Sequence, residues 1–309
     1  MRRTAIAAGV MLAPVLVFVG LAGWAGPPRL RAEETPARPK ILGIAGVEIV
    51  SSNVAATNLF YGRLVELDGA CNWCENNPYT VVDIPSGQVV GLTPSGRKPP
   101  KSMLASIVFI VDSEKAMKRL LVANNVPFKA GAGPYRDRDT YLFLADPEGH
   151  KIYFRNAKHW DKTDYGHLAV LNAGFAVKDR ERMDKFYKDI LGFHLYWHGG
   201  RYGEETDWVD MQVPDGTDWI EYMLNAPENA DSRTLGAMNH IALGVRDVRA
   251  AAEALEAKGM ELPEEPKIGR DGKWELNLYD PDGTRVELME FTPVERPCCA
   301  EFTGPHPKP

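Results

Sequence analysis

The chain has 309 residues, a length that fits two domains of ordinary size. Its hydrophobic content of 44%, charged content of 25% and net charge of -6 are typical of a globular protein, which argues against a disordered chain and against a bundle of membrane helices. The Lys and Arg residues are scattered and form no stripe interleaved with aromatic residues, so nucleic acid is not an expected partner.

The N-terminus has the pattern of a targeting segment. Arg2 and Arg3 precede an uncharged apolar run over residues 5–25. This pattern predicts a secretory signal peptide in residues 1–32, followed by a linker in residues 33–40. A run of about 20 apolar residues is also long enough to span a bilayer, so an uncleaved membrane anchor is the alternative. In both cases the basic residues stay inside the cell, and the folded part is expected to be exported to the periplasm or the cell exterior.

Four cysteines are present, as a Cys71-x-x-Cys74 motif and an adjacent pair, Cys298 and Cys299. In an oxidising compartment disulfides are their expected state. Because a bond between neighbouring residues has unfavourable geometry, we expect one or two disulfides that tie the C-terminal tail, residues 294–309, to the loop around Cys71 and Cys74. A redox-active motif and a four-thiolate zinc site are the alternatives. Both fit less well, since Cys71 lies in a loop rather than at a helix start and adjacent cysteines are poor tetrahedral ligands.

The ordered part of the sequence contains an internal repeat. The matching segments are 60–65 with 186–191, 84–87 with 213–216, and 146–149 with 280–283. Residues 41–157 and 165–293 are therefore predicted to be two copies of one structure.

Each copy divides again into two similar units. Residues 172–179 align with residues 240–247, and both segments read as an apolar strand that leads into a helix. Glycines at 192 and 259 then end the predicted helices. Short runs of Val, Ile, Tyr and Trp between turn residues follow and indicate three further strands. The sequence thus predicts an α+β fold in which a β-α-β-β-β unit is used four times.

This arrangement resembles the vicinal oxygen chelate superfamily, which includes glyoxalase I, extradiol ring-cleaving dioxygenases, fosfomycin-resistance proteins and methylmalonyl-CoA epimerase. The segments that carry the resemblance are 186–193, 239–245 and 280–288. The resemblance implies two tandem domains, 41–157 and 165–293, each a pair of βαβββ modules that forms an open barrel. Four modules close both barrels within one chain, so no protein partner is required.

The resemblance also implies a metal site in the second domain. Family ligands come from the first and last strands of each unit, which here offer Asn172, Glu221, His240 and Glu287. The residues themselves support this, because His240 and Glu287 interrupt apolar strands, where polar groups need partners. The alternatives are a hydrogen-bonded core histidine and a glutamate that faces solvent. The expected cofactor is a divalent ion, Zn, Ni, Mn or Fe.

The first domain lacks such a set. Its equivalent positions are Ile44 or Gly46, Gly91, Ser106 and Tyr153. These residues cannot bind a divalent cation together, so this domain is expected to be free of metal. It is then either a scaffold or a binding site for an organic ligand.

The predicted ligand set bears on the chemistry. Ring-cleaving dioxygenases bind Fe(II) with two His and one carboxylate, and here Asn172 replaces the first His. Other imidazoles, His167, His194 and His198, do not occupy the family position. The set is closer to the Gln, Glu, His, Glu shell of glyoxalase I.

The resemblance therefore implies an exported, glyoxalase-like isomerase, epimerase or lyase that acts on a small oxygen-chelating substrate. Glu221 or Glu287 would shuttle the proton. Glyoxalase I itself uses cytosolic glutathione adducts, which an exported protein is not expected to meet. An extradiol-type Fe(II) dioxygenase and a non-enzymatic small-molecule-binding protein of the resistance type are the alternatives.

Overall fold

The computed structural model describes residues 36–68, 81–133, 139–159, 167–203 and 205–309. The predicted signal segment 1–32, part of the linker, and the Cys71 and Cys74 pair lie outside these ranges. Within them, no helix combines the length and the apolar character needed to cross a membrane.

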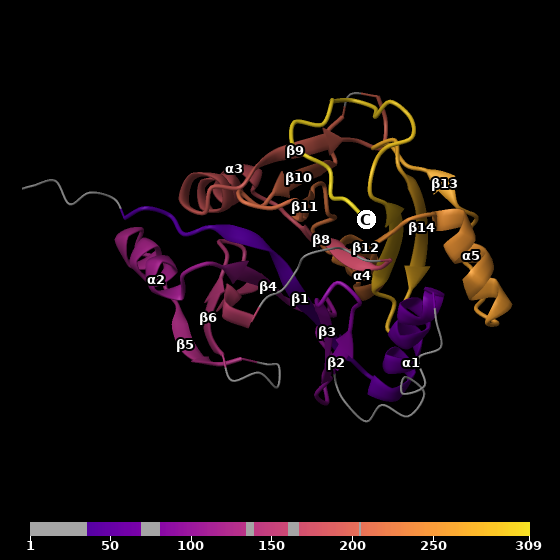
Figure 1. The fold of residues 1–309 in the computed structure, drawn as a ribbon, viewed down its shortest axis with the longest axis horizontal. Helices are drawn as coiled ribbons and strands as arrows, with labels where there is room; N and C mark the ends of the chain where they lie inside the picture. Colours follow the sequence, from indigo (N-terminus) through magenta and orange to yellow (C-terminus); the bar gives the residue numbers. More distant parts are fainter. Residues whose placement is uncertain (1–35, 69–80, 134–138, 160–166, 204) are drawn as a thin grey trace, which may run out of the picture. The chain divides into compact units, whose positions relative to one another are not determined.

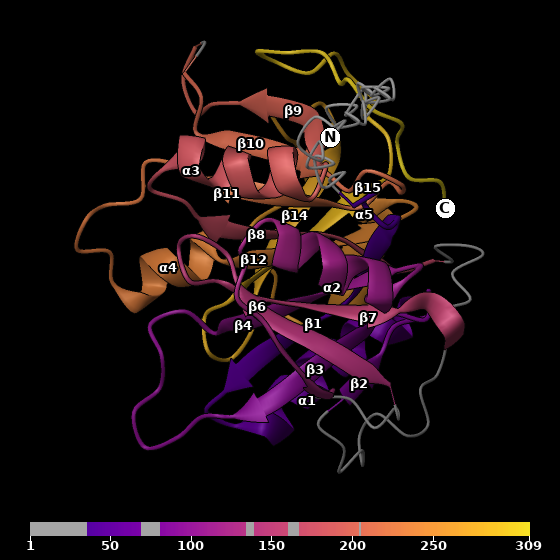
Figure 2. The same cartoon turned by 90° about the vertical axis from the view of Figure 1, so that its left-hand side faces the viewer.

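The first half of the chain forms a seven-stranded sheet with the order β2-β3-β1-β4-β7-β6-β5 (Figure 1). Its strands are β1 (Ile41–Ser51), β2 (Val81–Asp83), β3 (Val89–Pro94), β4 (Leu104–Val111), β5 (Lys129–Ala132), β6 (Thr140–Ala145) and β7 (Lys151–Asn156). Its helices are α1 (Val54–Val65) and α2 (Glu114–Ala123), with the short turns η1 (Glu66–Asp68) and η2 (Ala157–His159). Helix α2 packs on β6 and β7 (Figure 2).

The second half forms an eight-stranded sheet with the order β13-β14-β15-β12-β8-β11-β10-β9. Its strands are β8 (Ala169–Ala176), β9 (His194–Gly199), β10 (Trp208–Gln212), β11 (Trp219–Met223), β12 (His240–Val245), β13 (Lys267–Ile268), β14 (Trp274–Tyr279) and β15 (Arg285–Glu290). Its helices are α3 (Arg180–Asp184), which continues into the π-helical segment η3 (Lys185–Ile190), α4 (Ser232–Met238) and α5 (Val248–Ala257). Helix α5 packs on β14 and β15 (Figure 1).

Both sheets share one connection pattern. The first strands of paired units lie antiparallel at the centre, β1 beside β4 and β8 beside β12. The first and last strands of each unit run parallel, as in β8 with β11 and β12 with β15. The predicted α+β fold with pairs of βαβββ modules is confirmed.

Local sequence explains where the helices begin and end. The side chains of Asn53, Ser113, Asp179 and Asp247 each accept a hydrogen bond from a backbone N–H in the first turn of the following helix. At the other end, Gly192 and Gly259 adopt left-handed conformations, with φ of 81° and 75°. Residues 232–238, for which no element was predicted from the sequence, form helix α4.

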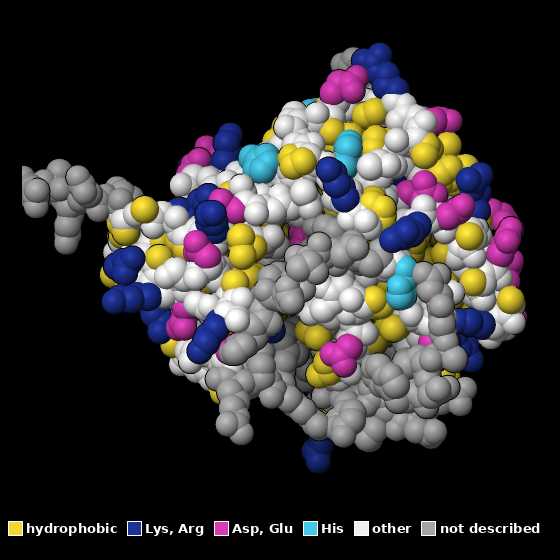
Figure 3. All heavy atoms as spheres, in the orientation of Figure 1, with side chains coloured by type: hydrophobic (Ala, Val, Ile, Leu, Met, Phe, Trp, Pro, Cys, Tyr) yellow, Lys and Arg dark blue, Asp and Glu magenta, His cyan; other side chains and the backbone are white. Residues whose placement is uncertain are grey.

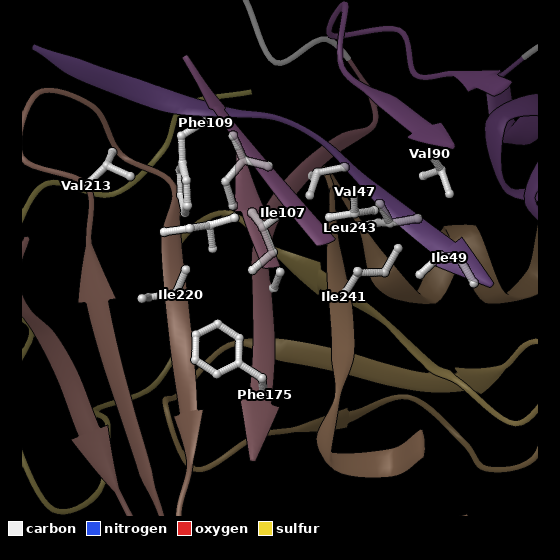
Figure 4. Packing of buried hydrophobic residues seen from close by; sticks show 14 of the residues in the cluster. Val47, Ile49, Val90, Ile107, Phe109, Phe175, Val213, Ile220, Ile241 and Leu243 are labelled. Carbon is white, nitrogen blue, oxygen red and sulfur yellow. The ribbon is translucent and has the colours of Figure 1, made fainter. Parts of the chain in front are cut away.

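The two halves share one hydrophobic core, and both belong to one compact unit, residues 35–309. Charged side chains of both signs are interspersed on the face drawn in Figure 3. Apolar side chains from both sheets meet in the interior (Figure 4). The labelled residues are Val47, Ile49, Val90, Ile107 and Phe109 from the first half and Phe175, Val213, Ile220, Ile241 and Leu243 from the second. Between the halves, the rings of Phe109 and Phe193 meet edge to face with centroids 5.5 Å apart.

Two polar side chains cross between the halves inside this core. Gln88, which is fully buried, donates from Nε2 to the carbonyls of Ile44 at 2.9 Å and Val170 at 2.7 Å. Its Oε1 accepts from the N–H of Val170 at 2.8 Å. In return, Asp218 in the equivalent turn of the second half accepts from the N–H of Ile44 at 2.7 Å. We call Gln88 and Asp218 the crossed clamp.

The C-terminal tail lies along β9 and β10. The N–H of Thr303 donates to the carbonyl of Tyr196 at 2.9 Å, and Nε2 of Gln212 donates to the carbonyl of Pro305 at 2.9 Å. The ring of Phe302 packs on Tyr196, with centroids 4.7 Å apart, and Nδ1 of His306 lies 2.6 Å from the hydroxyl of Tyr196. The tail is therefore fixed along its length against the second sheet.

The predicted link from the tail to the loop of Cys71 and Cys74 is wrong for the tail cysteines. Cys298 and Cys299 are bonded to each other. The tail is held beside the turn before β14, where the N–H of Cys298 donates to the carbonyl of Arg270 at 2.8 Å. Cys299 adopts a left-handed φ of 71°, which lets the chain turn at this pair. The hydrogen bond to Arg270 thus holds Cys298 and Cys299 at this turn, and the two cysteines are bonded to each other there.

Replacing Gln88 with Met tests the crossed clamp. The change keeps the volume but leaves three buried backbone groups of Ile44 and Val170 without partners. We expect the free energy of unfolding to fall by about 3 kcal/mol or more in urea titrations, since each of the three unsatisfied buried groups costs about 1–3 kcal/mol. Asn124→Ala is the matched control, because the amide of Asn124 donates only to Leu120 within its own turn. An equal loss in both variants would contradict a special role for Gln88.

Candidate metal centre

The strand register brings the predicted ligands into two adjacent rows across the second sheet. In the first row, Gly174 of β8 lies opposite both Glu221 of β11 and His240 of β12. In the second row, Ala242 of β12 lies opposite both Asn172 and Glu287. Each row places a residue with little or no side chain between two polar ones. Side chains that point to the same face can therefore converge above the small residues.

A cavity of about 110 Å³ lies over these rows. Asn172, Glu221 and Glu287 line it, whereas His240 lies beneath, fully buried. The other polar and aromatic lining residues are Asp210, Asp271, Glu275, Arg270, Arg285, Trp197, Trp208 and Trp219. They come from β9, β10, β11, β14, β15 and the turn before β14, so the second sheet curves around this space.

The imidazole of His240 is oriented by its own backbone. Its Nδ1 lies 3.1 Å from the carbonyl oxygen of Met238, so Nδ1 carries a proton and donates it. Its Nε2 lies 3.1 Å from Oε2 of Glu221 and 3.9 Å from Oε2 of Glu287. Despite these short distances, Nε2 makes no hydrogen bond of good geometry. A neutral ring would face two carboxylates with a lone pair, an arrangement that needs a cation or a second proton.

The carboxyl groups around the cavity differ in acidity. Burial by itself would raise the pKa of Glu221, but His240, Arg285 and Lys273 lower it below its ordinary value. Burial and then the charge of Glu221 raise the pKa of Asp210 well above its ordinary range. Burial and then the neighbouring Glu287 raise the pKa of Glu275 to about 10. The pKa of Glu221 is thus shifted down while the pKa values of Asp210 and Glu275 are shifted up, a separation typical of sites that move protons.

These residues fit a divalent ion. Two atoms bound to one ion at about 2.0–2.2 Å lie at most about 4.4 Å apart, a limit that the 3.1 and 3.9 Å separations respect. Oδ1 of Asn172 is buried and accepts no hydrogen bond, so it is available as a fourth ligand. Within the described ranges, however, no group of three or more His, Cys, Asp and Glu side chains is already gathered as a metal site. Instead, the imidazole of His240 lies directly against the carboxylates of Glu221 and Glu287.

The register also fixes the equivalent positions of the first sheet. Asn172 corresponds to Gly46, because Gly46 lies opposite Val108 as Asn172 lies opposite Ala242. This resolves the choice between Ile44 and Gly46. At the position of Gly174 the first sheet has Glu48, which accepts a hydrogen bond from Ser106 at 2.6 Å. A side chain thus fills the space that the second sheet leaves to the histidine ring.

Two residues at the cavity, Lys273 and Asp210, were not among the residues predicted from the sequence. Lys273 is fully buried, with Nζ 3.4 Å from Asp271 and 4.5 Å from the centroid of the Trp219 ring. Asp210 interrupts an apolar strand, as His240 does, and that pattern was available to sequence reasoning. Among the described residues that line the cavity there is no histidine. The alternative imidazoles His167, His194 and His198 are therefore not lining residues.

Sequence comparison identifies the family. The model of the Glyoxalase/Bleomycin resistance protein/Dioxygenase superfamily matches residues 165–288. Lactoylglutathione lyase of Haemophilus influenzae is 30% identical over 125 residues, which are 40% of this chain and 93% of that protein. The probable chloroplastic lactoylglutathione lyase of Arabidopsis thaliana is 29% identical over 144 residues, and the match spans 45% of this chain but only 40% of that protein.

Solved structures show the same fold over both halves. Homoprotocatechuate 2,3-dioxygenase of Arthrobacter globiformis superposes with a TM-score of 0.57 at 15% identity, over 83% of this chain and 82% of that one. A catechol 2,3-dioxygenase superposes with a TM-score of 0.56 at 14% identity, over 84% of this chain and 92% of that one. The protein belongs to the Glyoxalase/Bleomycin resistance protein/Dioxygenase superfamily.

The close approach of Gly174 and His240 gives a direct test of the first row. A Cβ at position 174 would lie 2.1 Å from Cε1 and 2.5 Å from Nδ1 of His240. We expect Gly174→Ala to lower the free energy of unfolding by about 1–3 kcal/mol and to shift the NMR signals of the His240 ring. The matched control is Gly131→Ala in β5, where the nearest atom, in Phe143, lies 3.6 Å away.

Combining Gly174→Ala with His240→Ala separates this contact from a general effect on β8. Because the second change removes the ring that clashes, the double variant is expected to lose less stability than the sum of the single variants. Additive losses would contradict the contact.

Proposed function

We propose that the protein is an exported, divalent-metal-dependent enzyme of the glyoxalase kind, an isomerase, epimerase or lyase for a small substrate with neighbouring oxygens. The observation that carries this proposal is the pair of rows that brings Asn172, Glu221, His240 and Glu287 to one cavity. The amide, imidazole and two carboxylates correspond in type to the shell implied by the glyoxalase resemblance. Similarity to lactoylglutathione lyases over the second half supports the same choice.

Each residue has a defined part in this reaction. Asn172, Glu221, His240 and Glu287 would hold the ion, which would supply Lewis-acid chemistry to the neighbouring oxygens of the substrate. Glu221, ionised because His240 and Arg285 outweigh its burial, accepts and returns the proton. The N–H of His240 bonded to Met238 keeps Nε2 directed at the carboxylates.

Ring cleavage by Fe(II) is the second candidate. The fold similarity to catechol-cleaving dioxygenases extends over more than four fifths of the chain, which favours this candidate. Against it stands Asn172, because an oxygenase site of this kind needs two imidazoles and one carboxylate. His240 is the one imidazole that the described residues place against the carboxylates of the cavity.

Export is supported by the sequence and by the tail. Arg2 and Arg3 before the apolar run of residues 5–25 have the pattern of a secretory signal. The bond between Cys298 and Cys299 fits an oxidising compartment. Sequencing the N-terminus of the protein from fractionated cells tests this part, and a cytoplasmic chain that starts at Met1 would contradict it.

Metal analysis tests the catalytic proposal. We expect about one divalent ion per purified chain by inductively coupled plasma mass spectrometry, and its loss in His240→Ala and in Glu287→Ala. His194→Ala is the matched control, because His194 bonds to Gln212 away from the cavity and should keep the ion.

A folded wild-type protein that binds no divalent ion would refute the enzyme and leave a small-molecule-binding protein. Oxygen uptake separates the two reactions. Consumption of oxygen with catechols by the Fe(II)-loaded protein would replace the isomerase or lyase with the dioxygenase.

A further inference from the structure

The cavity is surrounded by buried hydrogen-bond donors that make no hydrogen bond within the described part of the chain. They are the indole Nε1 of Trp197, the indole Nε1 of Trp219 and Nε of Arg285. Nζ of Lys273, beside the cavity, also makes no hydrogen bond. All four groups donate and none accepts. Because each unsatisfied buried donor costs about 1–3 kcal/mol, their concentration around one space indicates a ligand with several acceptor oxygens.

Two guanidinium groups, those of Arg270 and Arg285, lie among the five carboxyl groups that line the cavity, and a free guanidinium donor suits an anionic acceptor. Arg285 is held in place near Glu287, with Nη2 4.0 Å from Oε2, while its Nε remains free. Arg270 stands at the rim, where its Nε donates to the carbonyl of Gly200 at 3.1 Å. The N–H groups of a guanidinium can donate two parallel hydrogen bonds to the two oxygens of a carboxylate. Among common acceptors, only phosphate matches this geometry as well.

The size of the space favours a small substrate. Its volume of about 110 Å³ is well below the ~300 Å³ at which pockets for drug-sized ligands begin. The C-terminal tail is one reason, because Phe302 packs on Tyr196 and Trp197 and lies 5.1 Å from Nζ of Lys273. These contacts fix Trp197 as a wall of the cavity. A glutathione adduct, a tripeptide with a further acyl group, is larger than this space, so most of it would lie outside the cavity.

We propose, resting on the metal-dependent function above, that the substrate is a small carboxylic acid with a hydroxyl or carbonyl oxygen on the adjacent carbon, a 2-hydroxy or 2-oxo acid. Arg285 binds its carboxylate, and the indole N–H groups of Trp197 and Trp219 donate to its oxygens. The closed wall formed by Trp197 and Phe302 sets the upper limit of its length.

Tryptophan fluorescence provides the test, because three tryptophans line the cavity. The full chain is titrated with lactate, glyoxylate, catechol and S-lactoylglutathione. We expect saturable changes with lactate or glyoxylate and none with S-lactoylglutathione. Arg285→Gln should weaken the binding of the acid about ten-fold or more, since a hydrogen bond to a charged group contributes about 1.5–3 kcal/mol.

Matched variants separate binding from folding. Arg249→Gln removes a guanidinium that stacks on Trp274 outside the cavity, 4.7 Å from the ring centroid, and should bind the acid like the wild type. Arg285→Lys keeps the charge without the fork and should fall between wild type and Arg285→Gln. Circular dichroism identifies any variant that has lost its fold. Equal affinity in wild type and folded Arg285→Gln would overturn the proposal, as would tight binding of S-lactoylglutathione or a preference for catechol.

The titration is repeated after treatment with a chelator, which distinguishes this proposal from the metal-dependent function. Acid binding that depends on Arg285 in a protein that never holds metal would refute the metal-dependent function and retain the binding site. Stoichiometric metal that is lost in His240→Ala, without binding of either acid, would retain the metal function and refute this substrate class.

Discussion

The hydrogen bonds of the crossed clamp satisfy a constraint on which the candidate site depends. Strand β1 pairs with β3 only from Gly46 onward, and β8 pairs with β11 only from Asn172 onward. Ile44 and Val170 precede these points, so on that side they have no strand partner. In a dry core their backbone groups need partners, and each half supplies them to the other. The register shift that follows, between Val170 and Asn172, is tolerated for this reason. The first half of the chain, which lacks the predicted ligands, thereby helps to position Asn172 of the second half.

A second constraint is space between neighbouring strands. Where the second sheet has Gly174 between Glu221 and His240, the first sheet has Glu48 between Gly91 and Ser106. At these three equivalent positions, the large and small residues are therefore exchanged between the two sheets. Exchange of this kind preserves packing, so both sheets keep one fold while a histidine fits in only the second.

Features that repeat or alternate were predictable from the sequence, and features that depend on distant contacts were not. The four units and the rows of predicted ligands follow from the strand period of two and from helix caps such as Asp247. The choice between Ile44 and Gly46 was open because a bulge shifts the register by one residue. The position of Cys298 beside Arg270 and the burial of Lys273 depend on the fold of the tail, which has no periodic signal.

The charges around the cavity connect the neutral amide of Asn172 with the type of substrate. In the proposed metal site, the two carboxylates of Glu221 and Glu287 would balance one divalent cation, and the neutral amide of Asn172 would leave that balance unchanged. Asp271 already faces Lys273 at 3.4 Å. Arg285 lies 4.0 Å from Glu287 and also lowers the pKa of Glu221, but among the described residues its buried Nε makes no hydrogen bond. A buried donor on a charged group is costly without a hydrogen-bond partner, so the carboxylate of the proposed substrate would stabilise the site that binds it.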